Sequence, residues 1–233
     1  MTDMKGNILN RVRRLPKPTK PAQALQPLFE AVSNAMHAIE DEFQATAIAS
    51  GRINITITNL AATARSQIII SDNGIGLTND RFLAFCTTDT DFKLPRGGKG
   101  IGRLLWLDAF DRIKVTSIYE EGGRRQQRSF RFQLSPLDQI TDEIIELAKD
   151  GAVVGTTVEF SGLRGSYATK FPGQPDRLIR YFGAHFFAEF ILERFHRSPL
   201  PLTDKHQYSP VMCGTCSRAN AEERRSRQKS MAH

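Results

Sequence analysis

Apolar residues near the start of the chain recur at steps of three and four, which is the spacing of one face of an α-helix. The stripe consists of Leu25, Leu28, Phe29, Val32, Met36, Ile39 and Phe43. Gly51 ends this pattern, and isoleucines at positions 53, 55 and 57 then alternate with polar residues, as in a half-buried strand. A run of three isoleucines at residues 68–70 leads into a polar turn and is typical of a buried strand. The pattern therefore predicts a long helix followed by two strands.

Beyond this region the pattern predicts further helices and strands. The helices are predicted at residues 80–85, 101–110, 137–149 and 175–195. The strands are predicted at residues 113–118, 130–134 and 153–160, bounded by turns that contain glycine. Because short turns join strands of alternating polarity, the sheet should be mixed and mostly antiparallel, with helices on one face. The predicted fold class is α+β, a two-layer sandwich.

Length and composition indicate one large domain with basic ends. The chain has 233 residues, of which 40% are hydrophobic, enough to bury a sizeable core. We predict a basic N-terminal arm at residues 1–20, a core domain at residues 21–197, and an irregular basic tail at residues 198–233 that is a linker or a truncated end. The net charge of +7 permits nucleic acid as a partner, although solvated tails explain the charge more simply.

The three cysteines, Cys86, Cys213 and Cys216, are too few and too unevenly spaced for a disulfide framework. Cys213 and Cys216 form a CxxC pair, which is half of a zinc site, and zinc would need further ligands from another chain. No apolar run reaches the length of about 20 residues that a membrane span needs. The N-terminus has no apolar signal core. We therefore expect a cytoplasmic protein without a membrane partner.

Four polar residues lie on one face of the first predicted helix. They are spaced by four, three and four positions, which places them roughly opposite the apolar stripe: Glu30, Asn34, His37 and Asp41. On an isolated helix this face is most simply the solvent side. A functional interpretation therefore needs support from elsewhere in the chain.

The first support comes from the turn after the buried strand at residues 68–70. Asp72 ends that strand, and Gly74 and Gly76 follow closely. A carboxylate accepts hydrogen bonds from an exocyclic amino group such as the 6-amino group of adenine. Glycines let the backbone approach a planar ligand and adopt conformations closed to other residues. An ordinary β-turn has the same composition, so this segment alone leaves both interpretations open.

The second support is a glycine-rich segment at residues 97–103, which reads Gly-Gly-Lys-Gly-Ile-Gly-Arg and runs directly into a predicted helix. Backbone N–H groups at a helix start bind anions, and Lys99 adds a positive charge for a terminal phosphate. A flexible glycine hinge is the alternative. The spacing does not fit a P-loop, and the segment lacks the strand that precedes a dinucleotide fingerprint.

In this order, the segments resemble the GHKL superfamily, which includes gyrase B, the large heat-shock chaperones, sensor histidine kinases and MutL. The N box of that family is matched by residues 30–35, its adenine-binding glycine box by residues 72–76, and its phosphate-binding glycine box by residues 97–103. Residues 155–158 resemble the late strand whose threonine reaches the adenine through water. The glycine-rich segment and its helix also resemble bacterial stand-alone ATP-binding proteins of this class. The resemblance covers residues 25–160 and implies a Bergerat-type ATP-binding fold.

The resemblance also implies a role for each matched residue. Asn34 would offer its side-chain oxygen to Mg²⁺, and Glu30 would act as the general base. Asp72 would bind the adenine amino group, supported by Thr156 or Thr157, and residues 87–96 would form a lid over ATP. The residues implied to bind the nucleotide are Asn34, His37, Asp72, Gly74, Gly76, Gly98, Lys99, Gly100, Ile101, Gly102, Thr156 and Thr157.

One position departs from the family pattern, because His37 stands where the N box usually has Asp. Two interpretations of this departure stay open: His37 faces the nucleotide site, or it is an ordinary surface histidine. Glu30 separates the chain from the kinase branch, which usually lacks that base. We therefore expect an ATPase that binds Mg-ATP, hydrolyses it slowly and acts as a conformational switch, with a homodimer on ATP binding and an unknown effector. An ATP-binding module without turnover, histidine-kinase-like phosphotransfer and nucleic-acid binding by the basic ends stay open as alternatives.

Overall fold

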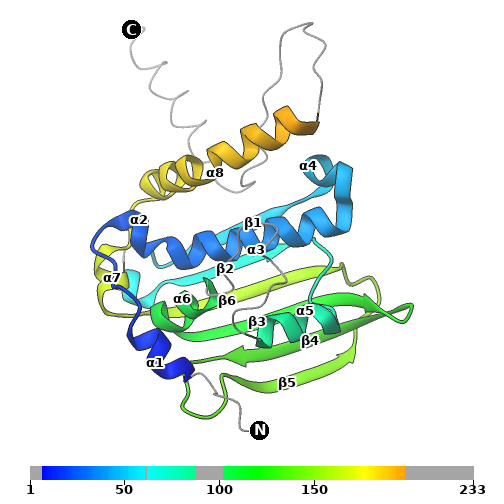
Figure 1. Cartoon of the computed structure of the whole chain (residues 1–233), viewed down its shortest axis with the longest axis horizontal. Helices are drawn as coiled ribbons and strands as arrows, with labels where there is room; N and C mark the ends of the chain where they lie inside the picture. Colours follow the sequence, from blue (N-terminus) through cyan, green and yellow to red (C-terminus); the bar gives the residue numbers. More distant parts are fainter. Residues whose placement is uncertain (1–6, 61, 88–101, 198–233) are drawn as a thin grey trace, which may run out of the picture. The chain divides into compact units, whose positions relative to one another are not determined.

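The computed structural model describes residues 7–60, 62–87 and 102–197, without the side chains of residues 48 and 188–197. These residues form one open six-stranded sheet and a set of helices, so the predicted α+β class is confirmed (Figure 1). All neighbouring strands of the sheet pair antiparallel. No helix among the described residues has the length and apolar character needed to cross a membrane.

The strands follow the order β1-β2-β6-β3-β4-β5 across the sheet. Their bounds are β1 (Ile53–Thr58), β2 (Gln67–Asp72), β3 (Phe110–Glu121), β4 (Arg124–Phe132), β5 (Ile140–Leu147) and β6 (Gly155–Leu163). The helices are α1 (Ile8–Arg13), α2 (Pro21–Ala24), α3 (Gln26–Phe43), α4 (Ala47–Ser50), α5 (Asn79–Cys86), α6 (Gly102–Ala109), α7 (Gly165–Lys170) and α8 (Pro175–Arg197). Two 3₁₀ turns are also present: η1 (Gln44–Thr46) precedes α4, and η2 (Thr63–Arg65) precedes β2.

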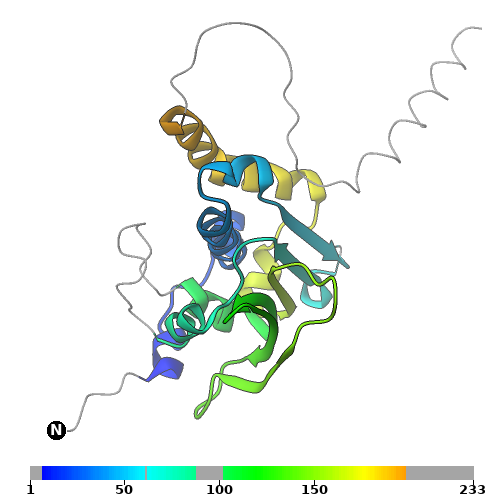
Figure 2. The same ribbon diagram turned by 90° about the vertical axis from the view of Figure 1, so that its right-hand side faces the viewer.

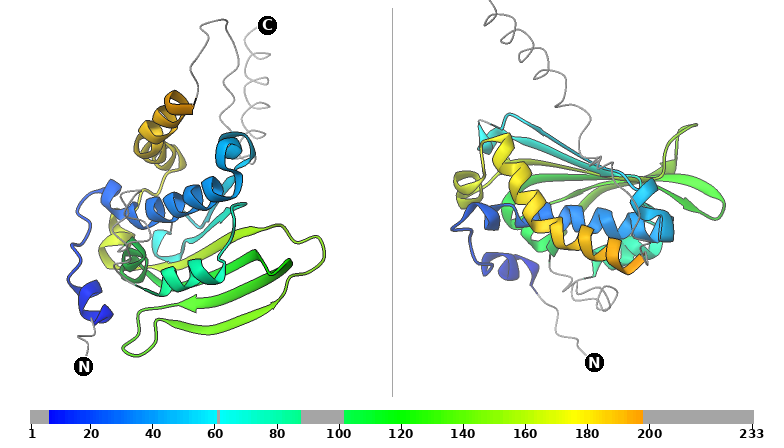
Figure 3. Two further views of the ribbon diagram at one scale, coloured as in Figure 1. Left: turned by 45° about the vertical axis from the view of Figure 1, so that its right-hand side comes forward. Right: turned by 90° about the horizontal axis from the view of Figure 1, so that it is seen from above.

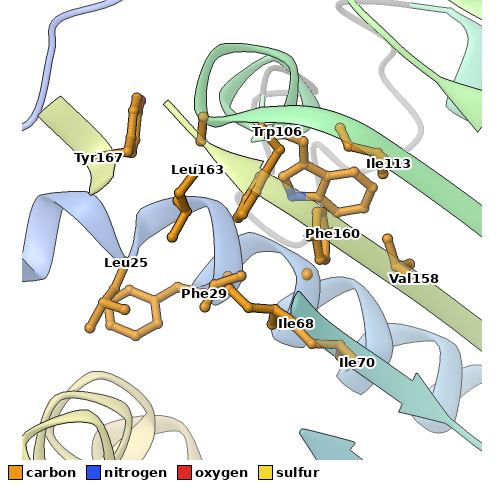
Figure 4. Packing of buried hydrophobic residues seen from close by; sticks show 14 of the residues in the cluster. Leu25, Phe29, Ile68, Ile70, Trp106, Ile113, Val158, Phe160, Leu163 and Tyr167 are labelled. Atoms are coloured by element: carbon orange, nitrogen blue, oxygen red, sulfur yellow. The ribbon is translucent and has the colours of Figure 1, made fainter. Parts of the chain in front are cut away.

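Helices α3, α5 and α6 lie on the same side of the sheet (Figure 2). The core between these layers is aromatic, with Trp106 of α6 in an edge-to-face contact with Phe160 of β6 at a centroid distance of 5.3 Å (Figure 4). The Trp106 indole N–H donates to the Pro27 carbonyl over 2.8 Å, which fixes α6 against the start of α3. Helix α8 runs alongside α3 when the molecule is seen from above (Figure 3), and the Phe182 ring of α8 lies edge-on to Phe29 of α3 at a centroid distance of 5.1 Å. Thus α3 is held on several sides at once.

The predicted helix at residues 137–149 is wrong, because this segment forms the edge strand β5. Its apolar residues have helix-like spacing, yet Ile144 and Leu147 are 55% and 69% exposed. Pairing with β4 decides the conformation: Glu143 forms an ion pair with Arg128 at 3.1 Å, in addition to the backbone ladder. Cross-strand contacts of this kind override the weak intrinsic preference of a short segment.

The predicted N-terminal arm at residues 1–20 is also wrong for its described part. Helix α1 packs against α6, and Val12 is 1% exposed within the main hydrophobic core. Lys17 forms an ion pair with Asp108 of α6, which extends this contact beyond α1. The compact unit that holds the described fold ends at Ser198, close to the predicted boundary at residue 197. The predicted tail lies outside the described residues.

The Val12→Ala variant tests whether α1 belongs to the core. Removing two buried methyl groups should lower the free energy of unfolding by about 1–3 kcal/mol. The same substitution at Val153, which is 71% exposed, should change the free energy by less than about 0.5 kcal/mol. Urea denaturation of both variants measures the difference. Equal stabilities for the two variants would show that α1 does not contribute to the folded core.

Candidate functional site

A cavity lies between α3, α5, α6 and the sheet, and several predicted site residues line it. Its volume is about 130 Å³, and its polar lining comes from Glu30, Asn34, Asp72, Thr156, Arg81 and Arg103. Apolar side chains, among them Leu77, Phe85 and Val158, form most of the remaining wall. One water molecule needs only about 10–15 Å³ of such space, so the cavity has room for an organic ring. A mostly apolar wall with a few convergent polar groups is typical of a small-molecule site.

One end of the cavity is formed by α3, where Glu30 and Asn34 lie one helical turn apart. The Asn34 amide nitrogen is 3.5 Å from Glu30 Oε1, at the outer limit of a hydrogen bond. In this orientation the Asn34 amide oxygen is an additional acceptor, of the hard type that magnesium prefers. Both side chains are partly exposed. The helix therefore presents a carboxylate and an amide oxygen as a pair.

Gly102, the first residue of α6, lies directly against Glu30. A Cβ atom at Gly102 would be only 1.8 Å from the Glu30 carboxyl carbon, so no other residue fits without moving that side chain. Residue 102 is the last glycine of the predicted phosphate-binding segment. Two segments that are 72 positions apart in the sequence are therefore in contact at this end of the cavity.

The other end of the cavity is formed by the turn that follows β2. Asp72 Oδ1 accepts a hydrogen bond from the Gly74 N–H at 2.9 Å, and Ile75 N–H donates to the Ala38 carbonyl of α3 at 3.0 Å. Gly74 packs so closely on α3 that a Cβ atom would lie 2.4 Å from the Ala38 carbonyl carbon. The turn is thus attached to the same helix that carries Glu30 and Asn34.

A buried hydroxyl group supports this turn from the sheet side. Ser117 of β3 is fully buried, accepts a hydrogen bond from the Leu77 N–H at 2.8 Å and lies 2.9 Å from Thr156 Oγ1. Gly76 has a φ of +75°, and a Cβ atom there would lie 2.3 Å from the Ile118 carbonyl oxygen. Sequence reasoning missed Ser117, although a polar residue among the inward positions 113, 115 and 119 of the strand is a usable signal.

The structure distinguishes between the two candidate threonines. Thr156 lines the cavity, and Thr157 is absent from its lining. Successive residues of a strand point to opposite faces, so Thr157 lies on the face of β6 away from the helices. It is paired there with Ser71 and Thr116 of the neighbouring strands. Of the two candidates, only Thr156 lines the cavity, and nucleotide binding by Thr157 stays a prediction.

Two further predicted residues do not line the cavity. Gly74 contacts the backbone of α3 instead, so its role is to seat the turn. His37 is partly exposed, its Nδ1 atom is buried, and it lies outside the described lining, so its role in nucleotide binding stays a prediction. Four predicted phosphate-binding residues, Gly98, Lys99, Gly100 and Ile101, lie outside the described residues, as does the predicted lid apart from Thr87.

Two cavity-lining arginines were not predicted. Arg81 of α5 forms an ion pair with Asp41, which bridges α5 and α3. The guanidinium of Arg103 in α6 lies over the Phe85 ring at 5.4 Å and donates to the Thr87 carbonyl. Arg103 could have been singled out from its place in the glycine-rich segment, whereas nothing in the sequence around Arg81 points to the cavity.

Burial raises the pKa of Asp72 from its ordinary value of 3.8 to about 6, and hydrogen bonds from the Gly74 and Thr156 N–H groups only partly oppose this effect. The carboxyl is removed from water by the walls of the cavity, which disfavours its charged form. A buried carboxyl with a displaced pKa in a concave site is typical of a residue kept for binding or catalysis.

The raised pKa of Asp72 predicts a pH-dependent cost to stability. Because the folded protein holds this proton more tightly than the unfolded chain, ionisation destabilises the fold as pH rises from about 4 to 6. A difference between 3.8 and about 6 corresponds to about 3 kcal/mol, and the partial exposure of Asp72 reduces the expected effect to about 1–3 kcal/mol.

Urea denaturation of wild type and Asp72→Asn between pH 4.5 and 7.5 measures this cost, because the variant cannot titrate at position 72. The stability of the variant relative to wild type should increase with pH and level off near pH 7. A difference that does not change with pH would contradict the raised pKa.

Comparison of the chain with models of known protein families gives no match, and a search of curated proteins gives no match either. No cluster of three or more His, Cys, Asp or Glu side chains that could hold a metal ion is found among residues 7–60, 62–87 and 102–197. Cys86 is an exposed free thiol, and Cys213 and Cys216 lie outside the described residues. The functional assignment therefore depends on the arrangement of the cavity residues.

Proposed function

We propose that the chain is a GHKL-type ATPase that binds Mg-ATP in this cavity, hydrolyses it slowly and acts as a nucleotide-driven switch. One observation carries the proposal: Glu30, Asn34, Asp72 and Thr156, from three separate segments, line one cavity, and Gly102 lies against Glu30. These are residues that the sequence motifs single out before any geometry is known. Their convergence on one cavity is the arrangement that a Bergerat-type site requires.

The spacing along α3 supports an elongated ligand. Ala38, to which the Asp72 turn is attached, is eight residues beyond Glu30, which corresponds to about 12 Å along a helix. A purine at the Asp72 end would donate its amino group to the carboxylate, beside Thr156 and Gly76. Its phosphates would then extend toward Glu30 and Asn34. The polar groups at the two ends of the cavity thus match the two ends of a nucleotide.

The phosphate end has the groups needed for hydrolysis. Asn34 and the phosphate oxygens would hold magnesium, which when bound neutralises charge on the phosphates. Glu30 would orient a water molecule and accept its proton as the water oxygen attacks the terminal phosphorus. The bond between that phosphorus and the bridging oxygen breaks, and ADP and phosphate leave. The absence of a side chain at Gly102 leaves the space that the Glu30 carboxylate occupies.

Calorimetry with Mg-ATP, followed by measurement of phosphate release, tests the proposal. We expect binding that weakens without magnesium, and slow release of phosphate. Binding without turnover would favour an ATP-binding interaction module, and transfer of the terminal phosphate to the protein would favour kinase-like chemistry. No binding of Mg-ATP by the folded protein would refute the proposal.

We extend the proposal to dimer formation on ATP binding and to a cytoplasmic location. Sedimentation velocity with and without a non-hydrolysable ATP analogue tests the dimer. A shift from monomer to dimer mass on addition of the analogue is the expected result.

A further inference from the structure

Arg103 connects the end of α5 to the start of α6 and also lines the candidate site. Its guanidinium donates to the carbonyl of Thr87, the residue that follows α5, and lies over the ring of Phe85 at 5.4 Å. The side chain is partly exposed, and the hydrogen bond to Thr87 is open to solvent. A guanidinium in this setting can exchange its carbonyl partner for another acceptor at little cost, because water can replace it at the carbonyl.

The position of Arg103 within the cavity identifies which part of a nucleotide it would meet. Its neighbour Gly102 is in contact with Glu30, so Arg103 enters the cavity at the Glu30 end. Asp72 lies at the opposite end, where the turn is attached to Ala38. In the proposed binding mode the Glu30 end holds the terminal phosphates, and a guanidinium is suited to binding phosphate through two parallel N–H donors.

Arg128 shows what a purely structural arginine looks like in the same protein. It is 3% exposed, lies over Phe82 at 4.2 Å and donates to the Leu77 carbonyl at 2.9 Å. It also donates to Asn79 Oδ1 at 2.6 Å, so it fixes the segment after the Asp72 turn. Arg128 is enclosed within the fold, whereas Arg103 is partly exposed and lines the cavity. Arg128 therefore stabilises the fold, whereas Arg103 is accessible to a molecule bound in the cavity.

We propose that Arg103 binds the terminal phosphate of a nucleoside triphosphate and leaves the Thr87 carbonyl when it does so, a role that rests on the proposed function. The stack on Phe85 can be kept while the donors of the guanidinium turn toward the phosphate. The same side chain then distinguishes triphosphate from diphosphate. It also transmits that difference to the end of α5.

Nucleotide affinities of the Arg103→Ala variant test this role. Calorimetry with Mg-ATP, Mg-ADP and AMP should show a loss of about 10–100-fold for ATP, less than about threefold for ADP and no change for AMP. Arg103→Lys should recover only part of the loss, because lysine lacks the two-donor geometry. Arg112→Ala is the matched control, since Arg112 is exposed, pairs with Ser161 and is not among the cavity-lining residues.

The outcomes separate this role from the proposed function. If wild type binds none of the nucleotides, the proposed function fails and the role of Arg103 fails with it. If wild type binds ATP but Arg103→Ala weakens ATP, ADP and AMP equally, Arg103 only supports the fold of the site and the inference is overturned. Unchanged ATP affinity in Arg103→Ala overturns it as well. Should Arg103→Ala not fold, the ratio of ATP to ADP affinity in Arg103→Lys decides by the same criterion.

Discussion

Replacement of Glu30 by Gln is expected to lower ATP turnover by about 10²–10⁴-fold while changing Mg-ATP affinity by less than about threefold. The proposed general base acts only on the attacking water, so its loss should affect the reaction and not the bound ground state. Gln is the sharper substitution here, because it fills the space against Gly102 and can still accept the hydrogen bond from Asn34. Ala would open a gap between α3 and α6.

The matched control for this experiment is Glu42→Gln, an exposed carboxylate near the end of the same helix. Turnover and affinity of this variant should equal those of wild type. Single-turnover phosphate release, together with calorimetry, separates the chemical step from binding. Turnover in Glu30→Gln that matches wild type would show that another group activates the water, and the assignment of Glu30 would then be wrong.

Replacement of Asp72 by Asn is expected to weaken Mg-ATP binding by about 10–100-fold. An ionised carboxylate accepts a charge-assisted hydrogen bond from the 6-amino group of adenine, and the amide of Asn is a weaker and less versatile partner. The loss should depend on the base. Wild type should prefer ATP over inosine triphosphate, which has no 6-amino group, and the variant should lose this preference.

The pKa of Asp72 adds a pH dependence to the same prediction. Since only the ionised carboxylate accepts fully, wild-type affinity for ATP should fall as pH drops below about 6, whereas the variant should show no such decrease. Asp80→Asn, an exposed carboxylate on α5, is the control and should behave as wild type. If wild type and Asp72→Asn prefer ATP over inosine triphosphate equally, Asp72 does not bind the 6-amino group of the purine.

Long periodic segments of the sequence predicted the fold well, and local competition explains the failures. The stripe from Leu25 to Phe43 and the alternation at residues 53–57 became α3 and β1, because burial of one face enforces each period. The prediction for β5 was wrong because this edge strand buries neither face completely, so its sequence lacks the alternation of apolar and polar residues that indicates a strand. The prediction for α1 was wrong because Ile8, Leu9 and Val12 lie beside basic residues and shortly before a proline-containing segment, so their pattern is a weak signal.

At the candidate site, sequence motifs found the residues with a recognisable spacing and missed those that only tertiary structure brings near. Glu30, Asn34 and Asp72 belong to short patterns, and the structure brings them to one cavity. Arg81 is placed at the cavity by α5, which its ion pair with Asp41 links to α3, and no local sequence pattern encodes this contact. The choice of Thr156 over Thr157 depends on the register of β6, and a one-residue shift would have reversed it.

The attachment of the Asp72 turn to the Ala38 carbonyl gives both ends of the site one common mechanical support. A change that tilts or rotates α3 would displace Asp72, the proposed acceptor for the base, together with the side-chain oxygens of Glu30 and Asn34. Effects of substitutions at Gly74 and at Asn34 should consequently be non-additive when combined, although Gly74 seats the turn at one end of the cavity and Asn34 lines the other end. The spacing of residues along α3 therefore sets the distance between the two ends of the candidate site, and with it the length of molecule that the site can accept.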